Sequence, residues 1–208
     1  MSYETEEQQV EAIKLWWKNN ATSVFTGVLI GLIAVFGWRY WDNHRNMIAA
    51  EASALFEQLV ISVDKGQDQI AIQQVKTLQD NYKSTPYASF ANLMEAKRLL
   101  AKNDITGAKK ALQQVIDKAP EIAFKTIAVL RLARIQISSK DLQAATQLLV
   151  QYPPDKAFKA EYAALRGDIE NAKGNIEAAR QAYQEALNGT VGQADLIKLK
   201  LDNLPPAS

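Results

Sequence analysis

The sequence predicts an all-α protein in which one N-terminal transmembrane helix precedes an α-solenoid of three to four helix pairs with a C-terminal capping helix. The first observation is a run of 20 uncharged residues at positions 19–38, which is long enough to cross a bilayer as a helix. The second is a short motif that recurs every 34 to 37 residues in a chain rich in Ala, Leu, Gln, Lys and Glu. Repeats of that length are typical of stacked helix pairs.

The composition excludes several classes of function. Lys and Arg total 24 and Asp and Glu total 23, which gives a formal net charge of +1, so we expect no nucleic-acid partner. The chain has no cysteine and a single histidine, His44, which excludes disulfides, thiolate nucleophiles and multi-histidine metal sites. The sequence also lacks the phosphate-binding and hydrolase motifs. We therefore expect no cofactor, no metal site and no catalytic residue, and a protein that is not an enzyme.

Residues 1–19 are expected to form a short amphipathic segment at the membrane interface. Val10, Ile13 and Trp17 share one helical face, whereas Lys14 and Lys18 lie on another. A helix with this pattern lies along the membrane surface.

The transmembrane helix is expected at residues 20–41. Its 20 uncharged residues rise roughly 30 Å in a helix, and Lys18 and Arg39 stand on either side of them. No small-residue cleavage site follows, so we expect a permanent anchor rather than a removed signal peptide. Aromatic rings that favour the headgroup layer stand at both ends of the span: Trp16, Trp17, Trp38, Tyr40 and Trp41.

The charges that flank the span leave its orientation open. Lys14 and Lys18 precede it, and Arg39 and Arg45 follow it, so the count of flanking positive charges is a tie.

Gly27 and Gly31 form a G-x-x-x-G pair within the span. Such a pair lets two helix backbones approach closely and would allow a homodimer. The alternative is that these are two ordinary glycines, which are common in membrane helices.

Residues 46–208 are expected to form the repeat domain. A polar turn, then an aliphatic residue, then an alanine three positions later recurs at Asn103, Lys140 and Gly174, with a fainter copy at Gly66. Turns are expected at residues 64–66, 102–104, 138–141 and 173–175. The helix pairs are expected at residues 50–82, 87–118, 121–152 and 155–188, and the capping helix at 193–204.

These repeats look like degenerate tetratricopeptide repeats. One position midway along the first helix of each repeat is occupied by a small residue in the last three copies, namely Ala96, Ala133 and Gly167. In the first copy this position is Leu59. Small residues at that point let the paired helices pack closely. The early large aromatic of the tetratricopeptide pattern is missing, so the repeats depart from it there.

Analogy with that repeat predicts a protein-binding groove on the inward-facing side of the first helices. The fourth pair would contribute a polar, acidic end with Glu161 and Asp168. The alternative interpretation is that the apolar members are ordinary core residues. The groove residues are Phe56, Val60, Phe90, Leu93, Lys97, Leu130 and Arg134.

The N-terminal third carries a further resemblance. The runs Val10–Asn20 and Gly37–Trp41, around a glycine-containing span and before four degenerate repeats, resemble the YfgM-type family of ancillary subunits of the bacterial SecYEG translocon. The resemblance implies a single-pass inner-membrane protein with a short cytoplasmic N-terminus and its C-terminal domain in the periplasm. It also implies association with SecYEG and with the membrane-anchored periplasmic chaperone PpiD, and contact with unfolded exported polypeptides. It implies no catalytic residue.

Two functions are consistent with these observations. The first is a non-enzymatic translocon accessory that, with PpiD, holds or hands over newly exported polypeptides. The second is a structural tetratricopeptide scaffold that assembles a cell-envelope complex without binding clients. Replacing Phe90 and Leu130 with Asp should abolish crosslinking in a folded protein under the first interpretation, whereas it should unfold the domain if these residues are core.

Overall fold

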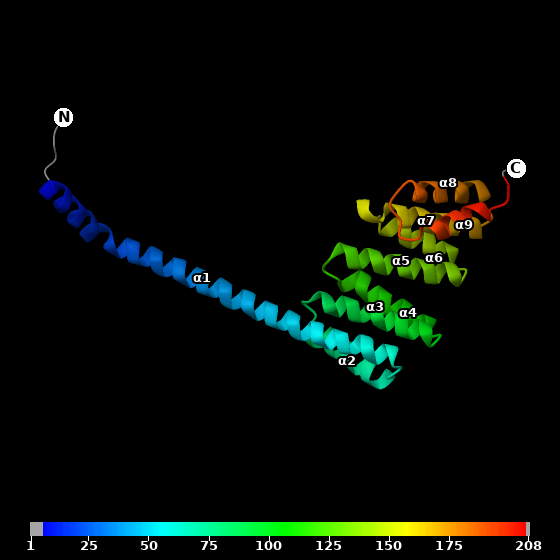
Figure 1. Cartoon of the computed structure of the whole chain (residues 1–208), viewed down its shortest axis with the longest axis horizontal. Coiled ribbons are helices and arrows are strands. Elements are labelled where there is room, and N and C mark those ends of the chain that lie inside the picture. Colours follow the sequence, from blue (N-terminus) through cyan, green and yellow to red (C-terminus); the bar gives the residue numbers. More distant parts are fainter. Residues whose placement is uncertain (1–5, 207–208) are drawn as a thin grey trace, which may run out of the picture. The chain divides into compact units, whose positions relative to one another are not determined.

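The computed structural model describes residues 6–206 of the chain, with side chains from residue 8 onward (Figure 1). It divides into two compact units, Met1–Ala50 and Glu51–Ser208. The first helix, α1 (Glu6–Asp64), runs through both. The expected start of the repeat domain at residue 46 falls within this helix, and residues 1–5 of the expected amphipathic segment lie outside the described residues.

In the first unit, α1 exposes apolar side chains all around its surface. An 18-residue window of it has a mean hydropathy of 1.9, and none of that window is buried. Phe25, Ile30 and Phe36 are each exposed by more than 60%. A soluble core helix would be covered, so this helix has the length and surface that a membrane span requires.

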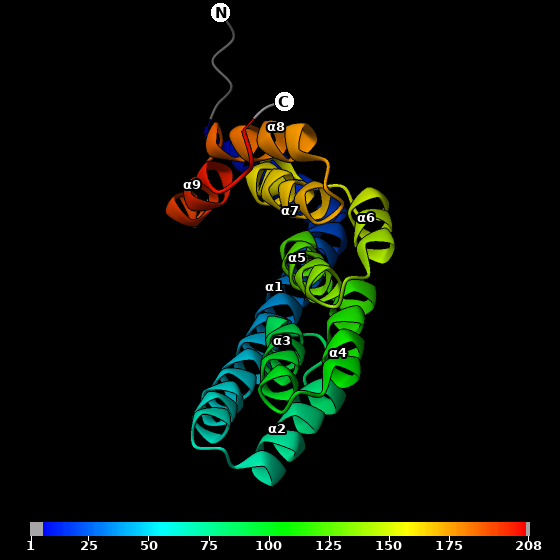
Figure 2. The same cartoon turned by 90° about the vertical axis from the view of Figure 1, so that its right-hand side faces the viewer.

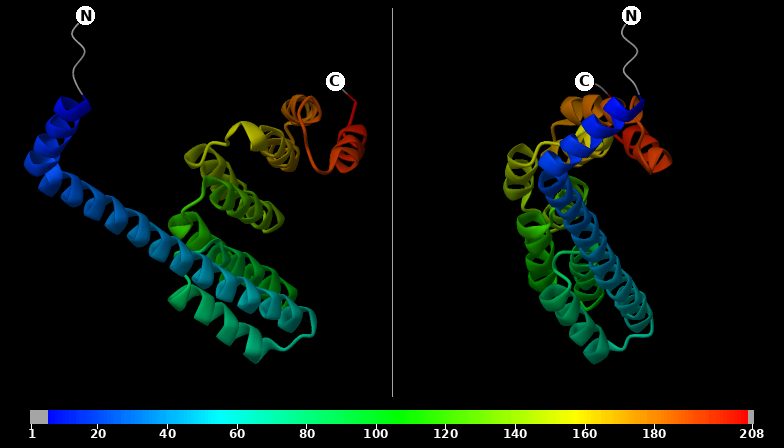
Figure 3. Two further views of the ribbon diagram at one scale, coloured as in Figure 1. Left: turned by 60° about the vertical axis from the view of Figure 1, so that its left-hand side comes forward. Right: turned by 90° about the vertical axis from the view of Figure 1, so that its left-hand side faces the viewer.

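The first turns of α1 bend away from the rest of the helix (Figure 3). The Trp17 and Phe25 rings meet edge to face with centroids 6.0 Å apart, although residues eight apart in a straight helix are separated by roughly 12 Å. The Asn20 side-chain amide also donates to the carbonyl oxygen of Trp16 at 2.9 Å, a type of bond that bends helices. The amphipathic turns are thereby set off from the apolar span.

The second unit is a stack of helix pairs (Figure 2), in which α3, α5 and α7 form one layer and α2, α4 and α6 the other. We call the surface of α3, α5 and the end of α1 that faces away from α2 and α4 the inner face. The expected helix pairs and the capping helix are confirmed, and most of their boundaries agree with the structure to within two residues. The elements after α1 are α2 (Asp68–Asn81), α3 (Pro86–Ala101), α4 (Ile105–Lys118), α5 (Ile122–Ser138), α6 (Leu142–Gln151), a short 3-10 turn (Lys156–Phe158), α7 (Lys159–Ala172), α8 (Ile176–Leu187) and α9 (Ala194–Asp202).

The motif that recurs in the sequence is the turn between the two helices of each pair. One residue of each turn has a positive φ: Gly66 (67°), Asn103 (61°), Lys140 (60°) and Gly174 (83°). The next amide donates to the carbonyl oxygen five residues earlier, as in Asp104 N to Leu99 O at 2.9 Å. This is a left-handed helix ending that satisfies the last carbonyls of the first helix.

Small residues midway along the first helices let the second, third and fourth pairs close, whereas the first pair buries Leu59 at that position. Ala96 and Ala133 are at most 2% exposed, and a Cβ added to Gly167 would fall onto the ring of Tyr183. At the end of the stack, Ile197 and Leu204 are buried with the α7–α8 pair. The last helix therefore covers the apolar end of the solenoid, as terminal repeats require.

Candidate functional site

Four aromatic rings from three helices meet on the inner face. Phe56 of α1 lies 5.5 Å from Phe90 and 5.9 Å from Tyr87, and Phe90 packs edge to face on Phe124 of α5 at 4.7 Å between ring centroids. Phe56, Tyr87 and Phe90 are half-buried, whereas Phe124 is 9% exposed. We call these four residues the aromatic cluster. Its half-exposed rings offer apolar area at little cost in conformational entropy.

Beside the cluster, towards the C-terminal ends of α3 and α5, lies a cavity of about 470 Å³. Leu112 of α4 is fully buried and forms its floor, so the cavity opens on the inner face. Three of the side chains that line it are positively charged. We call it the basic hollow, and it is lined by Lys97, Leu100, Leu112, Arg131, Arg134, Ile135 and Ser138.

The cations of the basic hollow are poorly compensated. Lys97 Nζ lies 3.7 Å from a carboxylate oxygen of Asp64, and both side chains are more than 60% exposed. Arg131 Nη1 donates to the carbonyl oxygen of Leu93 at 3.4 Å. Within residues 8–206, no carboxylate lies within 4 Å of the Arg131 or Arg134 guanidinium. Burial and then the charge of Arg134 lower the pKa of Arg131.

The structure divides the predicted groove residues into three groups. Phe56 and Phe90 join the aromatic cluster, and Val60 is half-buried on α1. Lys97 and Arg134 line the basic hollow. Leu93 and Leu130 are 6% and 5% exposed and belong to the main core, which leaves them little surface for a ligand.

Of the acidic end expected on the fourth pair, Asp168 is engaged within the chain, whereas Glu161 Oε2 is buried without a hydrogen-bond partner among residues 8–206. Asp168 accepts hydrogen bonds from Lys200 Nζ at 2.6 and 2.8 Å and from the Tyr183 hydroxyl at 2.8 Å. The contacts with Lys200 hold α9 against α7. Burial of the Tyr183 hydroxyl, and next its hydrogen bond to Asp168, raise the pKa of Tyr183. The Asp168 carboxylate is therefore a structural group.

Sequence reasoning missed three inner-face residues. Tyr87 stands three positions before Phe90, and Arg131 three before Arg134, which is the spacing of neighbours on one helical face. Phe124 follows Phe90 by 34 residues, the repeat length itself. Each spacing was available in the sequence.

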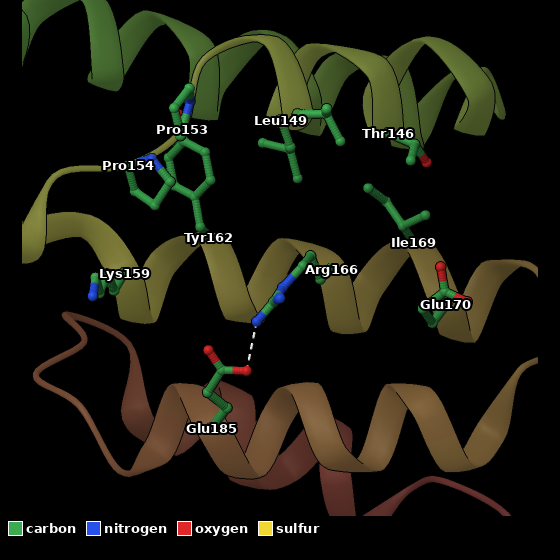
Figure 4. A pocket seen from close by; sticks show the side chains of 11 residues that line it. Thr146, Leu149, Pro153, Pro154, Lys159, Tyr162, Arg166, Ile169, Glu170 and Glu185 are labelled. Carbon is green, nitrogen blue, oxygen red and sulfur yellow. Dashed lines mark hydrogen bonds and ion pairs between the residues drawn. The ribbon is translucent and has the colours of Figure 1, made fainter.

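A second cavity, of about 480 Å³, lies between α6 and α7 (Figure 4). Pro153 and Pro154 end α6 after only 10 residues, which leaves a gap that Leu149, Tyr162 and Ile169 do not fill. The Tyr162 hydroxyl donates to the carbonyl oxygen of Tyr152 at 2.7 Å, and burial raises the Tyr162 pKa to about 12. Arg166 at its edge is paired with Glu185, and Glu170 is paired with Lys173. Lys159, which also lines the cavity, has no ion pair to residues 8–206.

The residues predicted to contact the membrane all have free surface. Trp16, Trp17, Trp38, Tyr40 and Trp41 are between 47% and 76% exposed, and the Arg45 guanidinium carbon lies 4.7 Å from the centre of the Trp41 ring. A Cβ added at Gly27 or Gly31 would meet nothing within 4 Å. That side of the helix is open to a partner.

Comparisons with known proteins agree with this architecture. Residues 14–206 match the family model described as a tetratricopeptide repeat-like domain. The chain is 34% identical to the Ancillary SecYEG translocon subunit of Haemophilus influenzae, over 96% of this chain and 97% of that protein. It is 33% identical to the protein of the same name from Aggregatibacter actinomycetemcomitans, over 96% and 97%. It is 32% identical to that of Escherichia coli, over 97% and 98%. No solved structure matches the chain significantly.

Proposed function

Because the chain belongs to the family of ancillary SecYEG translocon subunits and carries a tetratricopeptide repeat-like domain, we propose that it is a non-enzymatic, membrane-anchored accessory of the SecYEG translocon. Its repeat domain holds or hands over newly exported polypeptides, together with the chaperone PpiD. In this proposal the span holds the chain in the inner membrane, and the C-terminal domain lies in the periplasm, where exported chains emerge.

The observation that carries this proposal is the aromatic cluster on the inner face of a tethered domain. Phe56, Tyr87 and Phe90 are half-buried and come from two neighbouring helices. Their exposed area can take up apolar side chains of an unfolded chain without any folded partner surface. The anchor supports this role because it keeps the domain at the membrane.

Photo-crosslinking from the inner face tests client binding. A photoreactive residue replaces Tyr87 in the full chain, in membranes that carry a stalled exported polypeptide, and a matched chain carries it at Gln143 on the exposed surface of α6. We expect the Tyr87 position to capture the exported polypeptide and the Gln143 position to capture little. Equal capture from the two positions, or none from Tyr87, would contradict client binding by the inner face.

The orientation and the two protein partners need tests of their own. A reporter fused after Ser208 should be active only outside the cytoplasm. Solubilised full-length chain should co-purify both SecYEG and PpiD. A cytoplasmic signal from the reporter would overturn the periplasmic placement even if co-purification succeeded.

The second candidate function is a structural scaffold without clients. The burial of Leu93 and Leu130 favours it, because it removes two apolar residues from the predicted groove. Leu130→Asp should therefore unfold the domain under either function and no longer separates them. Tyr87→Asp separates them, because the ring is half-buried at the surface. It should abolish capture of exported chains while leaving a scaffold's stable complexes intact.

A further inference from the structure

We propose that the basic hollow is a carboxylate-binding site for an acidic side chain within a polypeptide that lies along the inner face and places an apolar side chain on the aromatic cluster. The inference rests on the proposed function for the class of ligand. It adds the chemistry by which the inner face would select one polypeptide segment over another.

Uncompensated positive charge is the first argument. Asp64 lies near Lys97, whereas residues 8–206 supply no ion-pair partner to Arg131 or Arg134. The repulsion between these two guanidinium groups contributes to the lowered pKa of Arg131. A carboxylate between them would replace that repulsion with two attractive contacts, and guanidinium groups bind carboxylates through paired, charge-assisted hydrogen bonds.

The walls of the hollow are the second argument. Leu100, Leu112 and Ile135 line it beside the cations, so an entering carboxylate loses part of its water. Charge pairs are stronger in such partly dry surroundings than on an open surface. The same walls can contact the methylene groups of a Glu side chain, which a free inorganic anion does not have.

The position of the aromatic cluster is the third argument, because it sets a spacing on the ligand. Phe90 and Lys97 lie seven residues apart on α3, which corresponds to a rise of roughly 10 Å. An extended polypeptide advances roughly 3.3 Å per residue. A ligand with an apolar side chain and an acidic side chain about three residues apart would therefore reach both features.

The cavity between α6 and α7 provides an internal contrast. It has a similar volume, but its Arg166 is already paired with Glu185 (Figure 4). The two cavities thus differ in the number of cations without an ion pair to residues 8–206: Lys159 alone lines the cavity between α6 and α7, whereas Arg131 and Arg134 both line the basic hollow. We therefore expect stronger charge selection at the basic hollow than at the other cavity.

Two peptides test the proposal with the full-length chain in phosphatidylcholine nanodiscs. Both are fluorescent, acetylated and amidated, with a Leu-Phe pair followed three residues later by Glu-Glu in one and Gln-Gln in the other. We expect the Glu peptide to bind about tenfold more tightly, with an advantage that shrinks as salt is added. A Gln peptide with a free C-terminal carboxylate should bind no more tightly than the amidated one.

Variants locate the effect. Arg134→Gln should reduce the advantage of the Glu peptide to about twofold or less, because Arg134 is exposed and its loss breaks no ion pair within residues 8–206. Lys110→Gln, which removes an exposed cation on α4, should preserve the tenfold advantage. Circular dichroism of each variant establishes that it is folded.

The outcomes separate this inference from the function on which it rests. Equal binding of the two peptides would overturn the carboxylate site while leaving polypeptide binding in place. Failure of both to bind would count against polypeptide binding by the inner face and against this site with it. Arg134-dependent binding of phosphatidylglycerol vesicles, without discrimination between the peptides, would assign the hollow to a lipid headgroup and overturn the proposal.

Discussion

Lys140 occupies a backbone conformation that residues with a Cβ avoid. Its φ is 60°, and the left-handed region costs such residues about 1–2 kcal/mol. Glycine relieves that cost but loses about 0.5–1 kcal/mol through the greater freedom of the unfolded chain. We therefore expect Lys140→Gly to raise the free energy of unfolding by about 0.5–1 kcal/mol, measured by denaturant titration. Ser139→Gly, at a φ of −82°, is the control and should lower it.

Gly167 is needed for the closure of α7 on α8. An alanine there gains about 1 kcal/mol in helix propensity, but its Cβ would fall onto the Tyr183 ring, and overpacking costs about 1–3 kcal/mol. We expect Gly167→Ala to lower the free energy of unfolding by up to about 2 kcal/mol, because the added Cβ would meet the ring itself. Gly192→Ala, where a Cβ meets nothing within 4 Å, should change little. If a smaller side chain at position 183 partly restores the stability of Gly167→Ala, the loss is due to the contact with the Tyr183 ring. Equal losses in Gly167→Ala and Gly192→Ala would contradict this explanation.

Individual groove residues were harder to predict than the small residues. Ala133 and Gly167 have one structural role, which is close packing, and the sequence shows it directly. Leu93 and Lys97 lie four positions apart on α3, yet the first is in the core and the second is exposed. Since the aromatic that fixes the register of a tetratricopeptide helix is missing, the pattern did not determine which face each apolar residue takes.

At the scale of elements, Asp68 at the start of α2 ties the first pair to α3. A hydrogen bond from Lys102 at 2.6 Å, with Arg98 adding to it at 3.2 Å, holds the pKa of this carboxyl below its ordinary value of 3.8. A lowered folded-state pKa means that the carboxylate stabilises the fold above about pH 4 and that this contribution is lost as the pH falls through the folded-state value. We expect the melting temperature to fall as the pH drops below 4, and to fall less steeply in Asp68→Asn.

A matched change checks that the acid effect belongs to this contact. Asp80 is exposed on α2 and has no ion pair to residues 8–206, so Asp80→Asn should leave the acid dependence of the melting temperature as it is. Thermal melts followed by circular dichroism between pH 7 and pH 2 measure all three chains. An Asp68→Asn curve parallel to that of the native chain would contradict the assignment.

The membrane helix offers an open face at Gly27 and Gly31, and we expect two copies to pair there. Because the chain has no cysteine, a Val28→Cys variant reports pairing through disulfide formation in membranes. Gly27→Leu and Gly31→Leu should each reduce the disulfide-linked fraction severalfold, since a bulky side chain separates the backbones. Ile33→Leu, on the opposite face, should not. Absence of a disulfide in every variant would rule out pairing through this face.

The boundaries of the elements were predictable because the turns have their own chemistry. Asp104 and Asp141 start their helices by accepting hydrogen bonds from the Gly107 and Ala144 amides at 2.8 and 3.3 Å, and such helix-capping residues are visible in a sequence. The cavity between α6 and α7 was not predictable in the same way. Pro153 and Pro154 showed where α6 ends, but not how α7 packs against the shortened helix.

At the scale of the whole molecule, the continuity of α1 from the apolar span into the first repeat is a feature that the sequence contained and that we did not predict. Residues 38–65 include no glycine and no proline, so nothing in them ends a helix. The change after Arg45 to a composition rich in Ala, Leu, Gln, Lys and Glu indicated that a new domain starts at residue 46, whereas the helix α1 continues through this point to Asp64. The composition of a segment indicates whether it lies in a membrane or in water, whereas residues such as glycine and proline indicate where a helix ends.

The permanence of the membrane anchor is the property on which the cellular role depends. We expect the chain to remain in the membrane pellet after carbonate extraction and to keep its full mass of 23.1 kDa. Leu29→Arg combined with Ile33→Arg should release it, because each arginine near the centre of a span costs about 2.5–3.5 kcal/mol. Asn46→Arg combined with Met47→Arg adds the same charge beyond the span and should leave the chain in the pellet. Release of the native chain by carbonate, or a mature chain without residues 1–41, would contradict a tethered accessory and require a diffusible one.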